Sequence, residues 1–150
     1  MTDLAAVLAY LNAEHGRALS ELVEFAAIPS VSTDPAHADD MNAAAAWLVA
    51  KFKDAGPFHV KTMLTPGASV VYAEWLGAPG APTALIYGHY DVQPEDPVEL
   101  WRSPPFEPTL RGGRLYGRGV SDDKGPLLIP IKVAEAFFAA SRSGDMSALQ

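Results

Sequence analysis

The sequence predicts a layered α/β domain, and three observations carry this prediction. Periodic apolar stripes typical of helices lie near both ends of the chain. Shorter apolar runs bounded by glycine and proline lie between them. The 150 residues are 49% hydrophobic and 19% charged, which is enough apolar surface for one packed core. Helix, helix, strands and helix is therefore the expected order of elements.

Two amphipathic helices are predicted in the first third of the chain. The stripe of the first follows alternating steps of three and four residues; its members are Leu4, Leu8, Leu11, His15, Ala18, Leu22 and Phe25. It ends at Pro29, because the residue before a proline disfavours helical geometry. The second helix carries Met41, Ala45, Leu48 and Phe52 on one face and ends at Gly56-Pro57.

Strands are predicted in the middle of the chain. Residues 58–64 and 69–76 read as two strands around Pro66-Gly67. Residues 83–87 form a short apolar run, which is the pattern of a strand buried on both faces. A Gly-Gly pair in residues 110–115 predicts a tight hairpin.

A last helix is predicted over residues 124–140. Leu128, Ile131 and Phe138 follow helical spacing. Pro130 lies beyond the first turn and is expected to kink or delay the helix. Glu135 has no acidic neighbour, so we expect it on the helix surface.

Composition excludes several classes of function. Eleven Lys and Arg against eighteen Asp and Glu give a net charge of −7, which argues against nucleic acid and membrane surfaces as partners. The absence of cysteine excludes disulfides, thiolate nucleophiles and cysteine-ligated metals. No basic signal segment opens the chain, and its longest apolar run, Ala43 to Ala50, is too short for a membrane span. We expect a cytoplasmic protein.

The first candidate site follows the run 83–87. His89 and Asp91 point to the same side of an extended segment. Asp91 could orient the His89 ring while the other ring nitrogen binds a metal. A histidine at a strand end that merely hydrogen-bonds a turn carboxylate explains the pattern equally well.

The second candidate is the glycine-rich stretch 117–125, which contains Asp122 and Asp123. Helix capping by these acids is the simpler explanation of this stretch alone. A phosphate-binding loop is a poorer explanation, because the spacing is not that of a Walker or dinucleotide motif and two acids would repel the phosphate. Taken together, the two stretches offer nitrogen and oxygen ligands for a divalent metal.

Residues 87–94 and 117–125 resemble the two N-terminal signatures of the M20 metallopeptidases. Residues 100–108 and 29–32 are similar to the same family, and the dipeptidase branch with its carnosinase-like enzymes is the best match. The resemblance implies a layered α/β/α domain with a mixed, mainly parallel sheet. Residues 1–150 would be the N-terminal part of this catalytic domain, without the family's lid and dimerisation domain.

The resemblance also implies roles for four residues. His89 would bind one of two divalent ions, with zinc favoured and manganese an alternative. Asp122 would bridge the two ions, and Asp91 would orient His89. Asp123 would follow Asp122 across a peptide bond that is often cis in this family.

The implied activity is hydrolysis of a dipeptide by a metal-activated water, with a glutamate as general base. That glutamate and the remaining ligands lie downstream in the family and are not found after Asp122, so we expect the chain alone to be inactive. Two alternatives stay open: an N-acyl-amino-acid deacylase of the same family, and a non-catalytic fragment. Small peptides or N-acyl amino acids would be the substrates, and homodimers are common in the family.

Two surface features complete the expectations. Arg118 could approach an anionic substrate group, although a salt bridge that braces its loop is the simpler interpretation. The family's sheet takes strands from beyond residue 150, so we expect an open sheet edge and exposed apolar surface.

Overall fold

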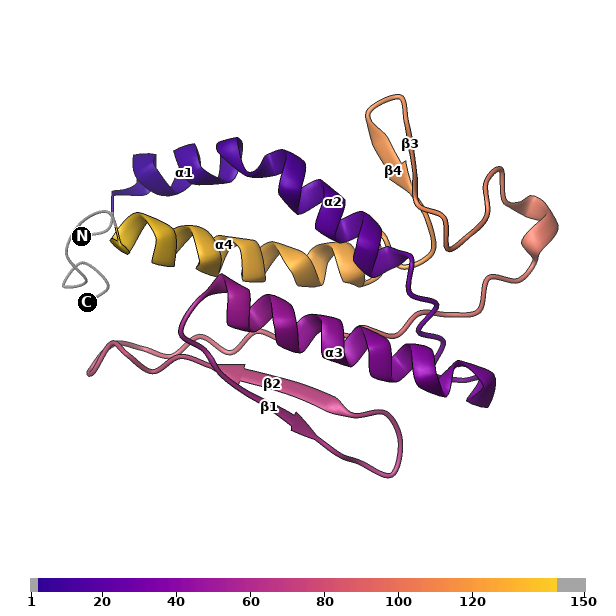
Figure 1. Cartoon of the computed structure of the whole chain (residues 1–150), viewed down its shortest axis with the longest axis horizontal. Coiled ribbons are helices and arrows are strands. Elements are labelled where there is room, and N and C mark those ends of the chain that lie inside the picture. Colours follow the sequence, from indigo (N-terminus) through magenta and orange to yellow (C-terminus); the bar gives the residue numbers. More distant parts are fainter. Residues whose placement is uncertain (1–2, 143–150) are drawn as a thin grey trace.

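The computed structural model describes residues 3–142 and has its helices stacked around the last one. Helices α1 (Leu4–Ala13) and α2 (His15–Ala26) lie on one side of α4 (Lys124–Arg142), and α3 (Ala38–Ala55) lies on the other (Figure 1). Helix α4 contacts all three of the others, which makes it the centre of the helical layer. No helix within residues 3–142 is long and apolar enough to cross a membrane.

The predicted first helix is divided in two at Glu14, so the expectation of one continuous helix is wrong. Backbone hydrogen bonds continue through the division, from Glu14 N to Tyr10 O and from Ala18 N to Glu14 O, each 2.9 Å long. Gly16, a weak helix former, lies in the first turn of α2. The bend lets both halves follow the surface of α4 (Figure 1).

Two antiparallel hairpins confirm the predicted turns. Strands β1 (His59–Met63) and β2 (Val70–Glu74) pair with Val60 opposite Ala73, and this hairpin packs on α3. Strands β3 (Thr109–Arg111) and β4 (Arg114–Tyr116) pair with Leu110 opposite Leu115.

The turn of the second hairpin consists of Gly112 and Gly113, at φ +55° and +74°. Glycine tolerates this left-handed geometry, which explains why the Gly-Gly pair predicted the hairpin. Two short 3₁₀ helices, η1 (Pro35–His37) and η2 (Val98–Leu100), lie in the connections.

The α/β class is confirmed, but two details of the predicted sheet are wrong for residues 3–142. Both pairs of strands are antiparallel, so the mainly parallel sheet does not form there. Residues 83–87 run without strand pairing, and Leu85 is 91% exposed instead of buried. The physical reason is the same for both: no described strand lies beside this segment to complete a ladder and cover its faces.

The core lies between α2, α3 and α4. Its fully buried members are Phe25, Ala44, Leu48, Ala55, Leu128 and Ile131. The rings of Phe25 and Trp47 stack in parallel, with centroids 4.4 Å apart and an interplanar angle of 5°. The predicted helical stripes contain Phe25, Leu48, Leu128 and Ile131 of this core but not Ala44 and Ala55. Leu4 and Leu8 of the first stripe are exposed.

Helix α4 corrects two further expectations. It begins at Lys124 and continues through Pro130, so the proline does not delay it. Glu135 is buried, not on the helix surface. It accepts hydrogen bonds from Lys132 Nζ (2.7 Å) and Tyr10 Oη (2.7 Å) and pairs with Arg17. A carboxylate can be buried here because three helices each bring it a donor.

Candidate metal site

The extended segment that carries His89 is held against the loop after α2. Val92 N donates to Ser30 O at 2.9 Å, and Ser30 Oγ donates to Tyr90 O at 2.6 Å. Ser32 Oγ donates to the carboxylate of Asp91. The residues 29–32 that entered the family resemblance are thus the residues that fix this segment.

All four predicted site residues meet at the N-terminus of α4. His89 Nε2 lies 3.0 Å from Asp122 Oδ1, and His89 Nδ1 lies 3.1 Å from Asp91 Oδ1. The backbone N–H of His89 donates to Asp123 Oδ2 at 3.1 Å. Residues separated by more than thirty positions in the sequence are therefore joined into one cluster around His89.

The turn that presents Asp122 and Asp123 has unusual backbone geometry. The peptide bond between the two is cis, as the family resemblance implied. Gly119 has a φ of +82°, and a Cβ there would lie 2.6 Å from Val92 Cγ1, so only glycine fits. The Asp123 carboxylate hydrogen-bonds the His89 backbone, so the turn serves the site as well as the start of the helix.

Lys124 anchors this turn to α2, and sequence reasoning did not single it out. Its side chain is fully buried, and Nζ donates to Phe25 O at 3.0 Å and Ile28 O at 2.6 Å. Burial lowers the pKa of Lys124 to about 8, although the negative charges of Asp40 and Asp91 act in the opposite direction. Lysine is seldom buried, so nothing in the local sequence indicated this position.

The electrostatics of His89 are set by its two carboxylate neighbours. Partial burial lowers the pKa of His89, but hydrogen bonds to Asp91 and Asp122 and the negative charges of both outweigh it, so the pKa is raised. Protons and metal ions compete for the same Nε2 lone pair, so cation binding at this nitrogen must strengthen as pH rises.

Three residues of the cluster, His89, Asp91 and Asp122, line a hollow of about 270 Å³. Gln93, Arg118 and Ser121 also line it. One imidazole nitrogen and one carboxylate oxygen converge there, and such a donor pair suits zinc or manganese. Asp122 has 85% of its side chain exposed and is free to bind a cation. Within residues 3–142 no group of three or more potential ligands converges. The described residues therefore fit part of a metal site.

Other sequence expectations were tested by the same structure. His59 and His15 are both exposed, and His15 is therefore not a packed member of the apolar stripe of the first helix. Arg118 makes no salt bridge with any residue between 3 and 142, so the expected bracing ion pair is wrong; its guanidinium lies over the Trp101 ring instead.

Comparison with known proteins supports the family resemblance. Residues 85–147 match the family described as peptidase family M20/M25/M40. A succinyl-diaminopimelate desuccinylase of Xanthomonas oryzae is 50% identical over 64 residues, which is 43% of this chain and 17% of that protein. A cysteinylglycine-S-conjugate dipeptidase of Corynebacterium striatum is 33% identical over 122 residues, which is 81% of this chain and 27% of that protein.

Solved structures of two dipeptidases share the fold. The dipeptidase Dug1p of Saccharomyces cerevisiae matches with a TM-score of 0.82 and 30% identity over 94% of this chain and 32% of its own. Human carnosine dipeptidase 1 matches with a TM-score of 0.81 and 31% identity over 91% of this chain and 31% of its own. The chain thus spans about a third or less of the length of each of these proteins.

Proposed function

We propose that this chain, which belongs to the M20 peptidase family, supplies two metal ligands and their supporting residues to a hydrolase of peptide or N-acyl amide bonds. Residues 1–150 would form the N-terminal part of its catalytic domain. One observation carries the proposal: His89 Nε2 and Asp122 Oδ1 lie 3.0 Å apart while Asp91 holds the other nitrogen of the same ring. Members of this family are metal-dependent, which agrees with that arrangement.

His89 and Asp122 would hold the metal, with zinc favoured by the nitrogen ligand and manganese accepted by the carboxylate. Asp122 would be the residue that bridges two ions, as the family resemblance implies. When bound, divalent ions supply Lewis-acid polarisation of the amide carbonyl and lower the pKa of a water molecule. The exposed carboxylate of Asp122 and the hollow beside it leave room for a small peptide or N-acyl amino acid.

Asp91 acts on the ring and not on the substrate. By accepting a hydrogen bond from Nδ1–H it would fix the tautomer whose Nε2 binds the cation, once the cation has replaced the proton that Nε2 shares with Asp122. Ser32 holds Asp91 in turn, and Asp123 holds the His89 backbone. A ring restrained at three points loses little freedom when it binds a cation.

The described residues supply no general base. No glutamate lines the hollow of the site, and Glu135 is buried among Lys132, Tyr10 and Arg17. We therefore propose that the 150-residue chain by itself does not turn over substrate. The base and the remaining ligands would come from additional sequence, and neither nucleic acid nor a membrane is involved. The absence of cysteine suits a cytoplasmic location.

Paramagnetic broadening by manganese tests the metal ligands, because it detects even weak binding. Substoichiometric Mn²⁺ should broaden the NMR signals of His89 and Asp122 selectively. His89→Ala and Asp122→Ala should abolish this selectivity, while His59→Ala, which removes an exposed histidine from β1, should preserve it. In calorimetric titration, His89→Ala and Asp122→Ala should likewise bind zinc more weakly than the wild type and His59→Ala do. Broadening that ignores both site substitutions would contradict the proposal.

Two substrate classes remain in competition, because different relatives favour each. The higher local identity is to a desuccinylase, whereas the longer alignment and both solved structures are dipeptidases. We favour a dipeptide substrate, because the dipeptidases align with a larger share of this chain than the desuccinylase does. The gene read past codon 150 decides whether either applies: an in-frame Glu-Glu segment and a later histidine would support the enzyme, and a stop codon would support a non-catalytic fragment.

A further inference from the structure

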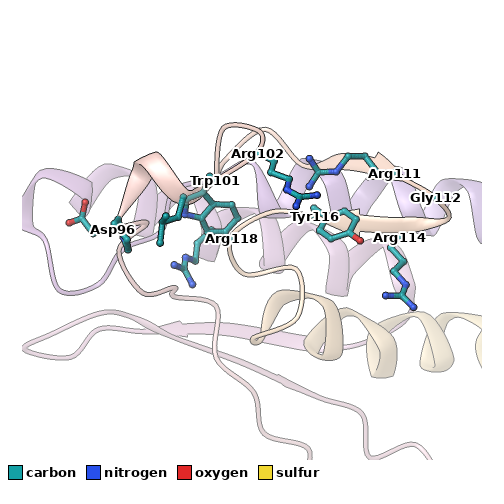
Figure 2. A pocket seen from close by; sticks show the side chains of 10 residues that line it. Asp96, Trp101, Arg102, Arg111, Gly112, Arg114, Tyr116 and Arg118 are labelled. Atoms are coloured by element: carbon teal, nitrogen blue, oxygen red, sulfur yellow. The ribbon is translucent and has the colours of Figure 1, made fainter.

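A second and larger hollow lies away from His89, between the η2 loop and the β3–β4 hairpin. Its volume is about 830 Å³, within the range of small-molecule sites. Figure 2 shows the side chains that line it, four of them arginines on either side of two aromatic rings. We call it the arginine hollow, and its basic and aromatic lining residues are Arg102, Arg111, Arg114, Arg118, Trp101 and Tyr116.

The charge of the arginine hollow is opposite to that of the chain. Four of the eleven Lys and Arg residues line it, although the net charge of the chain is −7. None of the four makes a salt bridge with a residue in the described range 3–142, and Asp96 is the one acid in the lining. Four unpaired guanidinium groups repel one another, and an anion between them would remove that repulsion.

The hairpin places two of the arginines in an unfavourable register. Arg111 and Arg114 are direct partners across the β3–β4 ladder, and like charges in such positions destabilise a strand pair. Arg111 Cζ lies 4.3 Å from the Tyr116 ring centroid, so stacking holds this guanidinium in place. This unfavourable pairing is explained if the guanidinium groups of Arg111 and Arg114 bind the same anionic ligand, because the ligand would offset their repulsion.

Arg118 is held rigidly on the opposite wall. Its guanidinium carbon lies 5.1 Å from the Trp101 ring centroid, and Trp101 Nε1 donates to Glu95 O at 2.8 Å (Figure 2). Its backbone N–H donates to Pro105 O at 2.8 Å. Arg118 Nε is buried and makes no hydrogen bond to any described residue. A buried donor without a partner is costly, so an acceptor that reached this atom would remove that cost.

We propose that the arginine hollow binds a small ligand that carries two or more carboxylate or phosphate groups. Guanidinium groups bind both oxyanions through paired hydrogen bonds, and the stacked rings orient two of them in advance. Arg118 lines the hollow of the metal site as well, so the two hollows adjoin through one side chain. The proposal requires no metal and stands or falls separately from the hydrolytic function.

The test uses the full 150-residue chain, freed of metal by a chelating resin and kept at low salt. Tricarballylate, a tricarboxylate, and pyrophosphate are titrated separately, with acetate as the single-charge control. Both polyanions should shift the NMR signals of the four arginine Nε–H groups and of the Trp101 indole N–H. The indoles of Trp47 and Trp75 should not move. A stronger response to one of the two probes identifies the ligand as carboxylate or phosphate.

Matched variants distinguish binding in the arginine hollow from a general effect of removing positive charge from the chain. The double variant Arg111→Gln and Arg114→Gln should weaken binding at least tenfold. The double variant Lys53→Gln and Lys61→Gln removes the same charge from exposed positions on α3 and β1 and should bind as the wild type does. Arg118→Gln offers a second site variant with the hairpin intact. Equal weakening by the lysine variant, or shifts of the wild type that are absent from the arginine and Trp101 signals, would overturn the proposal.

Discussion

The helical layer and the extended segment 83–87 differ in what covers their side chains. In the helical layer Phe25 and Ala44 are completely inaccessible to solvent. In the segment Leu85 and Tyr87 are 91% and 89% exposed. Both regions are rich in apolar residues, so hydrophobicity alone does not determine burial. What differs is the partner: α4 covers the other helices, and no described element covers the segment.

The same difference applies to the charged residues. In the helical layer, Glu21 and Glu135 lie among Lys132, Arg17 and Lys51, which bind their carboxylates. Burial raises the pKa values of Glu21 and Glu135, but hydrogen bonds and the charge of Lys132 and the other cations outweigh it, so both pKa values are lowered. At the candidate metal site, by contrast, Asp122 is exposed and pairs with one of the described residues, His89. The buried carboxylates of the helical layer are thus paired with cations of the same layer, whereas the exposed carboxylate of Asp122 can bind a further cation.

The largest effect is expected from breaking the buried charge network. Lys132→Ala removes the cation that contacts both Glu21 and Glu135, and leaves these buried carboxylates to Arg17 and Lys51. Removing one partner of a buried ion pair costs about 3–5 kcal/mol of unfolding free energy. Urea unfolding followed by circular dichroism measures it.

Lys53→Ala is the matched control, because Lys53 is exposed on α3 and its removal should change the unfolding free energy by less than about 0.5 kcal/mol. Equal effects of the two lysine substitutions would show that the network around Glu135 is solvated. The helical layer and the candidate metal site would then not differ in the burial of their charged groups.

A smaller loss is expected where the helical layer meets the site. Lys124→Met keeps the length of the side chain but leaves the carbonyls of Phe25 and Ile28 without their buried donor. Each carbonyl loses one of two hydrogen bonds, since Ile28 N still donates to Phe25 O and Ser30 N still donates to Ile28 O. The removal of a buried charge is favourable, so we expect a net loss of about 1–3 kcal/mol.

The same variant should also loosen the turn that carries Asp122. In Lys124→Met, both the free energy of unfolding and the broadening of the His89 signals by Mn²⁺ should therefore decrease. A variant that unfolds more easily but retains the full broadening would show that Lys124 stabilises α2 without positioning the site.

Sequence reasoning succeeded where a local pattern determines the structure. Helical spacing identified Leu48 and Leu128 as core residues, and the Gly112-Gly113 pair identified a hairpin. The two motifs placed His89 and Asp122 in one cluster. These features depend on contacts between neighbours in sequence or on motifs shared with a family.

Sequence reasoning failed where burial depends on partners distant in the chain. The apolar run at Leu85 and Ile86 satisfied the pattern of a buried strand, but a strand needs neighbours that no local pattern reveals. Glu135 was placed on the surface because its donors, Tyr10 and Arg17, lie more than a hundred residues away. The four arginines that share a hollow are likewise brought together by a loop and a hairpin.

Tyr10 allows a pH test of the buried network. Burial, followed by the hydrogen bond to Glu135 and the charge of this carboxylate, raises the pKa of Tyr10 to about 12. An unfolded tyrosine ionises near pH 10, so between pH 10 and 12 the unfolded chain loses this proton first. The stabilisation from Tyr10 is therefore complete below about pH 10 and is lost as pH rises toward 12.

Tyr10→Phe removes the hydroxyl and should cost about 0.5–1.5 kcal/mol at pH 9. The difference between wild type and variant should shrink at pH 11, because the wild type alone loses its Tyr10 contribution there. Urea midpoints at the two pH values measure both quantities. A difference that stays constant would show that the hydroxyl of Tyr10 is solvated like that of an exposed tyrosine.

The smallest effect tests the extended segment itself. Leu85→Ala and Leu48→Ala are the same chemical change at a side chain that is 91% exposed and at one that is 2% exposed. Leu48→Ala should cost about 2–5 kcal/mol through lost burial and the cavity it leaves, whereas Leu85→Ala should change the unfolding free energy by less than about 0.5 kcal/mol. Leu85→Ala should nevertheless reduce binding of a hydrophobic dye, because it removes exposed apolar surface. If Leu85→Ala proved as costly as Leu48→Ala, the segment would be covered in solution, and a cost that rises with protein concentration would identify a second copy of the chain as the cover.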